Sequence, residues 1–157
     1  MKIKIIAIGK TEEKYLKEGV SIYLNKLKHY IDIEFIEIPE LKYKKGISKK
    51  EQKIKEGLLI LNKLESSERL VLLDERGKNF TSVQFSEFIQ QQMNTSIKRL
   101  TFVIGGPYGF SDELYQKEHI LLSFSSMTFS HQMIRLFFLE QLYRGFTILN
   151  KEPYHHY

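Results

Sequence analysis

Three stretches in the second half of the chain combine residue types that could do chemistry. The glycine segment, Gly105–Gly109 (GGPYG), follows an apolar run, and the hydroxyl loop, Ser125–Ser130 (SSMTFS), follows a second apolar run. The C-terminal tail is Pro153–Tyr157 (PYHHY). Glycines after a buried strand let backbone amides approach a ligand closely. Two such strands and loops, followed by a very apolar helix, predict a ligand site next to a subunit interface.

The glycine segment does not fit a common nucleotide-binding motif. It lacks the spacing G-x-G-x-x-G, and no acidic residue lies about 20 residues beyond it to hold a ribose, which argues against a Rossmann site. Gly9-Lys10-Thr11 resembles the end of a P-loop, but Lys4 stands where that motif needs its first glycine. A tight turn without a ligand remains the alternative for the glycine segment.

The C-terminal tail has side chains suited to work on a base. Tyr154 could stack on a base that is splayed out of an RNA loop, and a neutral His155 could accept a proton. The alternative is a frayed end with chance histidines. The histidines do not pair at metal-ligand spacing with a nearby carboxylate, so we expect no metal. The chain has no cysteine, which excludes disulfides and thiolate chemistry.

A lysine cluster precedes these stretches. Between residues 42 and 55 one acid, Glu51, accompanies the lysines Lys42, Lys44, Lys45, Lys49, Lys50, Lys53 and Lys55. Phosphate backbones favour clustered cations because binding releases counterions. The cluster therefore predicts an RNA contact, with Lys44, Lys45, Lys49 and Lys50 as its centre. A solvated loop and helix face is the alternative reading, and the net charge of +5 is compatible with both.

The elements that must position these residues alternate along the chain. Apolar runs predict strands at 3–7, 33–38, 69–74, 100–104 and 120–124, and helical stripes lie between them. The first stripe is Leu16, Val20, Tyr23 and Leu27, and the second is Ile54, Leu58, Leu61 and Leu64. Such alternation predicts a single α/β domain over residues 1–157, with a mainly parallel sheet and helices on both faces.

Hydroxyl residues mark the expected helix starts. Ser48-x-x-Glu51 and Thr81-x-x-Gln84 have the spacing of capping boxes. Thr11, which precedes two glutamates, and Ser130 are expected to cap the first and the last helix.

The last helix, predicted at 131–150, is apolar around most of its circumference. Its apolar residues are Met133, Ile134, Leu136, Phe137, Phe138, Leu139, Leu142, Tyr143 and Phe146. Such a helix is either fully buried or shared with a partner, and in a chain of 157 residues we expect a homodimer. Glu140 and Arg144 are spaced to pair on its surface; an RNA contact is the alternative for Arg144.

The composition also limits the compartment. No apolar run approaches the roughly 18 residues that a membrane span needs, and the first residues lack the cleavage site of a signal peptide. We therefore expect a cytoplasmic protein without a membrane partner.

The segments FVIGGPYGF, LSFSSMTFSHQMIRLFFLEQLYR and EPYHHY together resemble the ribosomal RNA large subunit methyltransferase H family of the SPOUT superfamily. The opening MKIKIIAIGK and the central LLDERGK also fit, so the resemblance covers the whole chain. It implies a SPOUT fold with a C-terminal trefoil knot, although general folding rules argue against knots. It also implies a homodimer.

The resemblance further implies an activity and a set of contacts. The activity is methylation of N3 of a pseudouridine in large-subunit (23S) ribosomal RNA on the assembled ribosome, with S-adenosylmethionine as cofactor. The implied cofactor contacts are Leu73, Gly105, Ser125, Ser126, Met127, Thr128, Phe129 and Ser130, and the implied catalytic residues are Tyr154 and His155. Ser130 replaces a proline common in the family. One alternative function is the methylation of transfer RNA. The other is binding of RNA or a nucleotide without catalysis.

Overall fold

The structure is a computed structural model that describes residues 1–40, 46–117 and 119–156, except for the side chain of His119. Strands and helices follow one another as β1 (Lys2–Ile8), α1 (Lys14–Leu27), β2 (Asp32–Ile38), α2 (Lys49–Leu61), β3 (Glu68–Asn79), α3 (Ser82–Met93), β4 (Arg99–Ile104), α4 (Asp112–Gln116), β5 (His119–Ser123) and α5 (Met133–Leu149). This order confirms the alternation predicted from the sequence.

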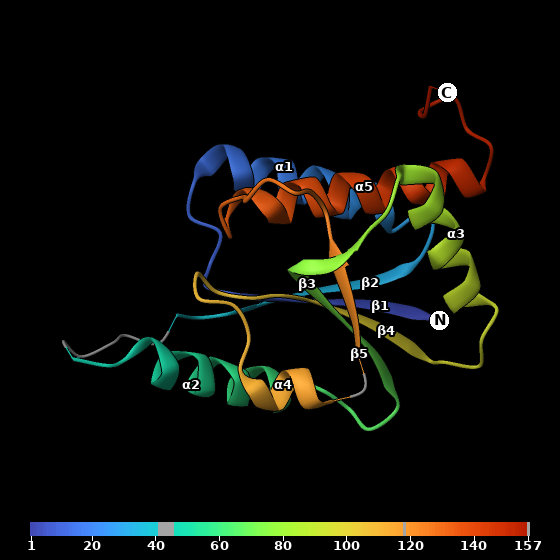
Figure 1. The fold of residues 1–157 in the computed structure, drawn as a ribbon. Coiled ribbons are helices and arrows are strands. Elements are labelled where there is room, and N and C mark those ends of the chain that lie inside the picture. The colour runs from blue at the N-terminus through green and yellow to red at the C-terminus, as the bar shows by residue number, and fades with distance from the viewer. Residues whose placement is uncertain (41–45, 118, 157) are drawn as a thin grey trace.

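The strands form one sheet in the order β2-β1-β4-β3-β5, and each of its pairings is parallel. Figure 1 shows α1, α3 and α5 on one face of the sheet and α2 and α4 on the other. The predicted α/β class is therefore confirmed. Because the strands run in the same direction, the loops that follow them emerge at one edge of the sheet. The strand order does not decide the trefoil knot, which stays a prediction.

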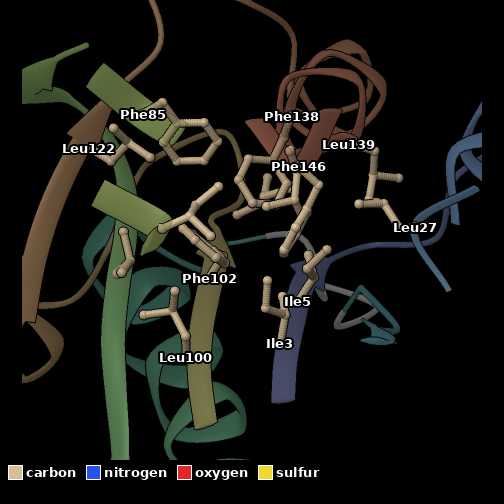
Figure 2. Close-up of a cluster of buried hydrophobic side chains, with 14 of the residues drawn as sticks. Ile3, Ile5, Leu27, Phe85, Leu100, Phe102, Leu122, Phe138, Leu139 and Phe146 are labelled. Atoms are coloured by element: carbon tan, nitrogen blue, oxygen red, sulfur yellow. The ribbon is translucent and has the colours of Figure 1, made fainter. Parts of the chain in front are cut away.

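Each face of the sheet has its own apolar core. On the α1, α3 and α5 face, Phe102 of β4 packs against Phe138 of α5, with ring centres 4.8 Å apart (Figure 2). On the other face, Ile6 and Val103 pack with Ile60 of α2. Strands that are covered on both faces have nearly continuous apolar sequences, which explains the uninterrupted apolar run of β4 at 102–104.

Both predicted capping boxes are confirmed. The Ser48 side chain accepts a hydrogen bond from the backbone of Glu51, and the Glu51 side chain accepts one from the backbone of Ser48. Thr81 and Gln84 exchange the same pair of bonds at the start of α3.

The predicted cap at Thr11 is wrong. Helix α1 begins at Lys14, after Glu13. Thr11 is instead buried, and its amide and hydroxyl both donate to the Glu37 carboxylate at the end of β2. The same hydroxyl accepts a hydrogen bond from Arg135 of α5 at 3.0 Å. A long-range polar contact has therefore replaced the local cap.

The predicted apolar face of the second helix is confirmed at Leu61 and Leu64, which pack partly buried against the core, and is wrong at Ile54 and Leu58. Ile54 and Leu58 are 44% and 47% exposed, whereas Glu56, Gly57 and Ile60 are buried. A Cβ atom on Gly57 would lie 2.3 Å from the Ser111 hydroxyl oxygen. The close packing of α2 against the start of α4 therefore determines which face of α2 is buried. The apolar periodicity of the sequence does not determine it.

Strand β3 contains an irregularity next to the edge where the loops emerge. Leu122 of β5 pairs both with Leu73 and with Lys78, so residues 74–77 form a bulge between them. A Cβ atom on Gly77 would lie 2.5 Å from the Leu122 backbone nitrogen. Only glycine fits at this point, because the backbones of the two strands meet there.

Candidate active site

A cavity of about 540 Å³ lies at the edge of the sheet where the loops emerge. Its walls come from the bulge in the middle of β3, the glycine segment after β4, the hydroxyl loop after β5 and the start of α5. Lys53 of α2 and Tyr115 of α4 complete the lining. Open parallel sheets commonly bind ligands at this edge, and the volume is ordinary for a small-molecule site.

The structure brings most of the predicted cofactor residues together. The lining of the cavity includes the predicted residues Leu73, Gly105, Ser125, Met127, Thr128 and Phe129. In the part of the chain that the structure describes, Ser126 and Ser130 belong to the same loop but do not line the cavity. Cofactor contact by these residues stays a prediction.

Hydroxyl groups hold the hydroxyl loop in shape. The Ser125 hydroxyl oxygen accepts from the backbone of Met127 at 2.9 Å, and the Ser123 hydroxyl donates to the Ser125 carbonyl at 3.1 Å. The Ser130 hydroxyl oxygen accepts from the backbone of Met133 at 3.1 Å. Ser130 thus holds the turn that leads into α5, whereas the helix itself begins at Met133 after Gln132, so the predicted helix cap at Ser130 lies too early in the chain. Serine provides here an acceptor that proline lacks.

The glycine segment is packed tightly from behind. A Cβ atom on Gly106 would lie 2.7 Å from a carboxylate oxygen of Glu56, a buried residue of α2. A Cβ atom on Gly105 would lie 3.1 Å from the ring of Phe110. The glycines are therefore required by the contacts behind the loop as well as by any ligand in front of it. Sequence reasoning missed Glu56, because it lies among the residues of a charged helix.

Asp74 and Arg76 line the cavity on the bulge of β3 and are bonded to each other. The Asp74 carboxylate accepts from Arg76 Nε at 3.0 Å and Nη2 at 3.2 Å, and also from the Tyr115 hydroxyl. Burial opposes the charge of Asp74, but the bonds from Arg76 and Tyr115 outweigh this and hold its pKa below the ordinary range. Burial and the bond to Asp74 raise the pKa of Tyr115 to about 12. Asp74 and Arg76 belong to the LLDERGK segment, but neither they nor Tyr115 were predicted as site residues.

Arg135 anchors the start of α5 beside the cavity. Its side chain is completely buried, with Nε donating to the His131 carbonyl at 3.0 Å and Nη2 donating to the Ile8 carbonyl at 2.7 Å. Burial lowers the pKa of Arg135, and the charge of Glu37 opposes this shift. An arginine has so high an intrinsic pKa that it stays protonated in a protein. The sequence feature that could have indicated this contact is the position of Arg135 within an otherwise apolar run of the last helix.

The C-terminal tail lies at the other end of α5. Tyr154 packs edge-on against Tyr143, and its hydroxyl donates to Glu140 at 3.1 Å. Arg144 donates to Glu140 at 2.6 Å, which confirms the predicted pair, and stacks 4.6 Å from the Tyr154 ring centre. Because Ile134 at the start of α5 lines the cavity, the length of the helix separates the tail from the cavity of its own chain. The structure therefore does not bring Tyr154 and His155 to the cofactor residues of the same chain.

The predicted RNA-binding lysines lie partly within the described structure. Lys49 and Lys50 are exposed in the first turn of α2, and Lys49 Nζ lies 5.2 Å from the centre of the Tyr108 ring in the glycine segment. Lys44 and Lys45, like Tyr157 of the tail, lie outside the described residues. The start of α2 therefore adjoins the cavity, although RNA binding stays a prediction.

Two further properties concern the described part of the chain. It contains no group of three histidine, aspartate or glutamate side chains arranged to hold a metal ion. Its helices are all too short or too polar to cross a bilayer.

Comparison with known proteins gives the family. The profile of the family described as "Predicted SPOUT methyltransferase" matches residues 1–155. The chain belongs to the SPOUT methyltransferase family. This SPOUT methyltransferase is 58% identical over 156 residues to a Christiangramia forsetii protein named "Ribosomal RNA large subunit methyltransferase H", with 99% of each chain covered. Proteins of the same name from Flavobacterium johnsoniae and Bacteroides thetaiotaomicron are 56% and 49% identical, again over 99% of each chain. The family predicted from the motifs is thereby confirmed.

The Asp74 contacts predict a pH dependence. Because the pKa of Asp74 is lowered in the folded protein, its charge stabilises the fold above the pKa of an unfolded aspartate, about 3.9. This stabilisation is lost as pH falls below that value through the folded pKa. We expect Asp74→Asn to unfold with a free energy roughly 1–3 kcal/mol below that of wild type at neutral pH, and the two proteins to converge below about pH 4. Urea denaturation across this range measures the difference, and a gap that stays constant into acid contradicts the assignment.

Proposed function

We propose that this SPOUT methyltransferase transfers a methyl group from S-adenosylmethionine to N3 of a pseudouridine in 23S ribosomal RNA of the large subunit, on the assembled ribosome. The observation that carries the proposal is the meeting of the glycine segment and the hydroxyl loop at one cavity. The names of its relatives, at 49–58% identity over 99% of the chain, support the ribosomal substrate. Because ribosomes are cytoplasmic, the reaction takes place in the cytoplasm.

The residues around the cavity fit the proposed cofactor. Leu73, Ile104 and Ile134 offer apolar surface for an adenine ring, and the glycine segment and hydroxyl loop offer backbone and hydroxyl groups for polar atoms. When bound, S-adenosylmethionine supplies an electrophilic methyl group. The protein then has to hold the acceptor base in line with the donor, exclude water and remove the N3 proton.

The tail supplies the base in this proposal. His155 accepts the N3 proton, for which positioned bases contribute about 10²–10⁴-fold in rate. Tyr154 contacts the target base or anchors the tail through its bonds to Glu140 and Tyr23. Since α5 separates the tail from the cavity of its own chain, the tail acts at the cavity of a second copy. The site is then complete only in a homodimer.

The surface next to the cavity supports a homodimer. Phe129 and Phe137 are 39% and 41% exposed, and their ring centres lie 5.0 Å apart. With Phe80 and Phe124 they line a second cavity of about 350 Å³. Exposed apolar patches of this kind mark interaction sites, and a second copy is the partner that the proposed composite site needs.

Filling the first cavity should abolish cofactor binding. Thr128 is one of the residues that line the cavity, so the indole ring of Thr128→Trp should compete with the cofactor for this space. Isothermal titration calorimetry should show a loss of affinity of about 10-fold or more, since each 1.4 kcal/mol of lost binding is tenfold. Ser66→Trp is the matched control, because Ser66 is exposed between α2 and β3, is not among the residues that line the cavity, and should leave cofactor affinity as in wild type. Equal affinities for the two variants would remove the hydroxyl loop from the site.

Stopping the chain after Glu152 should separate cofactor binding from catalysis. We expect the truncated chain and His155→Ala to keep cofactor affinity while single-turnover methylation of ribosomes falls by about 10²-fold or more. Incorporation of a labelled methyl group into unmethylated ribosomes, with free transfer RNA as the second substrate, measures this. Full activity of the truncated chain would contradict a catalytic role of the tail. Methylation of transfer RNA but not of ribosomes would contradict the ribosomal substrate. A wild-type protein that neither binds the cofactor nor methylates RNA would contradict the proposed enzyme activity.

Adjacent phenylalanines of α5 distinguish assembly from folding. Phe137 is partly exposed whereas Phe138 is completely buried. Phe137→Glu should therefore give a folded monomer, and Phe138→Glu should lose the fold, because burial of a phenylalanine contributes about 1.5–3 kcal/mol and a buried charge costs more. Light scattering combined with circular dichroism measures both properties. A wild-type monomer at micromolar concentration, or a Phe137→Glu dimer, would count against the proposed interface.

A further inference from the structure

Arg76 presents an ordered guanidinium group at the cavity although its side chain is 63% exposed. Its Nε and Nη2 atoms donate to the two oxygens of Asp74 at 3.0 and 3.2 Å. The Arg76 backbone also donates to Asp74, at 2.9 Å. Exposed arginine side chains ordinarily lose considerable rotamer entropy when they bind a ligand. These bonds have already restricted the Arg76 side chain before any ligand arrives.

Tyr115 holds the same group from a second side. The guanidinium carbon of Arg76 lies 4.5 Å from the centre of the Tyr115 ring, and the Tyr115 hydroxyl donates to Asp74. The Asp74 side chain is only 7% exposed. A buried carboxylate and an aromatic ring thus fix one charged group that is itself open to solvent.

The hydrogen bonds to Asp74 occupy one edge of the Arg76 guanidinium group, and a second edge of the group points away from Asp74. Nε and Nη2 form the edge that faces Asp74. The edge formed by Nη1 and Nη2 has the planar fork geometry that binds phosphate oxygens in pairs. The structure therefore presents a phosphate-binding edge in a defined orientation.

The surroundings favour an RNA phosphate over the cofactor as the anion. Lys53 lines the same cavity and lies on α2, one turn after Lys49, which stacks on Tyr108 in the glycine segment. An RNA backbone that contacts the start of α2 can therefore continue across the cavity toward Arg76. The neighbouring Glu75 is exposed and makes the local charge mixed, so the fixed geometry of Arg76 has to provide the recognition.

We propose that Arg76 binds a backbone phosphate of the substrate RNA at the cavity, with Asp74 and Tyr115 as the residues that position it. This inference rests on the proposed function, since it requires an RNA substrate. It adds a contact on β3 to the lysines of α2, so that RNA is held on both sides of the target base.

Three variants test the proposal by their affinity for unmethylated ribosomes, measured against KCl concentration at fixed magnesium. Arg76→Gln should weaken binding about 10-fold and reduce the log–log salt slope by about 0.7–0.9. Arg76→Lys should keep the slope, because it keeps the charge, and still bind less tightly, because it loses the fork. Arg69→Gln is the matched control: Arg69 is exposed near the beginning of the same strand, and its loss should leave affinity and slope as in wild type.

Cofactor affinity of the same variants identifies the anion. It should match wild type in all three, as measured by calorimetry with S-adenosylmethionine. If Arg76→Gln loses cofactor affinity while ribosome affinity is retained, the guanidinium binds the cofactor carboxylate and the proposal is overturned. It is also overturned if Arg76→Gln binds ribosomes like Arg69→Gln, which leaves Arg76 a purely structural role. Wild-type protein that binds neither ribosomes nor cofactor overturns the proposed function itself, which is a distinguishable result.

Tyr115→Phe tests the positioning role. This variant keeps the ring beneath Arg76 but loses the hydroxyl that donates to Asp74. It should bind ribosomes less tightly than wild type without a change in salt slope, since no phosphate contact is removed. A merely structural role would lower the urea midpoint and leave ribosome affinity unchanged, and that outcome would remove Tyr115 from the proposal.

Discussion

The side chain of Arg135 joins segments of the chain that lie far apart in sequence. Its guanidinium donates to the Ile8 carbonyl at the end of β1, to the Thr11 hydroxyl before α1 and to the His131 carbonyl before α5. It also lies 3.4 Å from Glu37 of β2. A buried charge is tolerated only where hydrogen bonds and counter-charges offset its lost hydration. The position of α5 relative to the sheet depends on this arrangement.

The position of α5 in turn determines the shape of the cavity. The hydroxyl loop runs from the end of β5 to the first turn of α5, so an anchored helix start fixes one end of the loop. The glycine segment is supported separately by Glu56 of α2, and the bulge of β3 is held by Asp74 and Tyr115. These three segments thus meet at one edge of the parallel sheet, and each is packed against or bonded to a buried polar side chain. This division lets α2 carry exposed lysines on one side and the support of the glycine segment on the other.

The sequence predicted what depends on local pattern. Apolar runs located the strands, capping boxes located the starts of α2 and α3, and the three spaced motifs gave the family. The contacts missed join residues that are distant in sequence. From the sequence, Thr11 has the position of a helix cap, but in the structure it bonds to the distant Arg135. Glu56 has the sequence context of a surface charge, but it is buried behind the glycine segment because α2 packs against α4. Local periodicity carries no information about such pairings, which is why the rotation of α2 and the contact between Tyr115 and Asp74 could not be predicted.

Arg135 fixes both the N-terminal segment and the loop beside the cavity. Hydrogen exchange in Arg135→Met, compared with wild type, tests this role most directly, because methionine fills much of the space but donates no hydrogen bond. We expect faster exchange of backbone amides at residues 9–12 and at 125–135 together, with protection of β3 and β4 retained. Unchanged protection of residues 125–135 in a variant that exchanges faster at 9–12 would contradict this role.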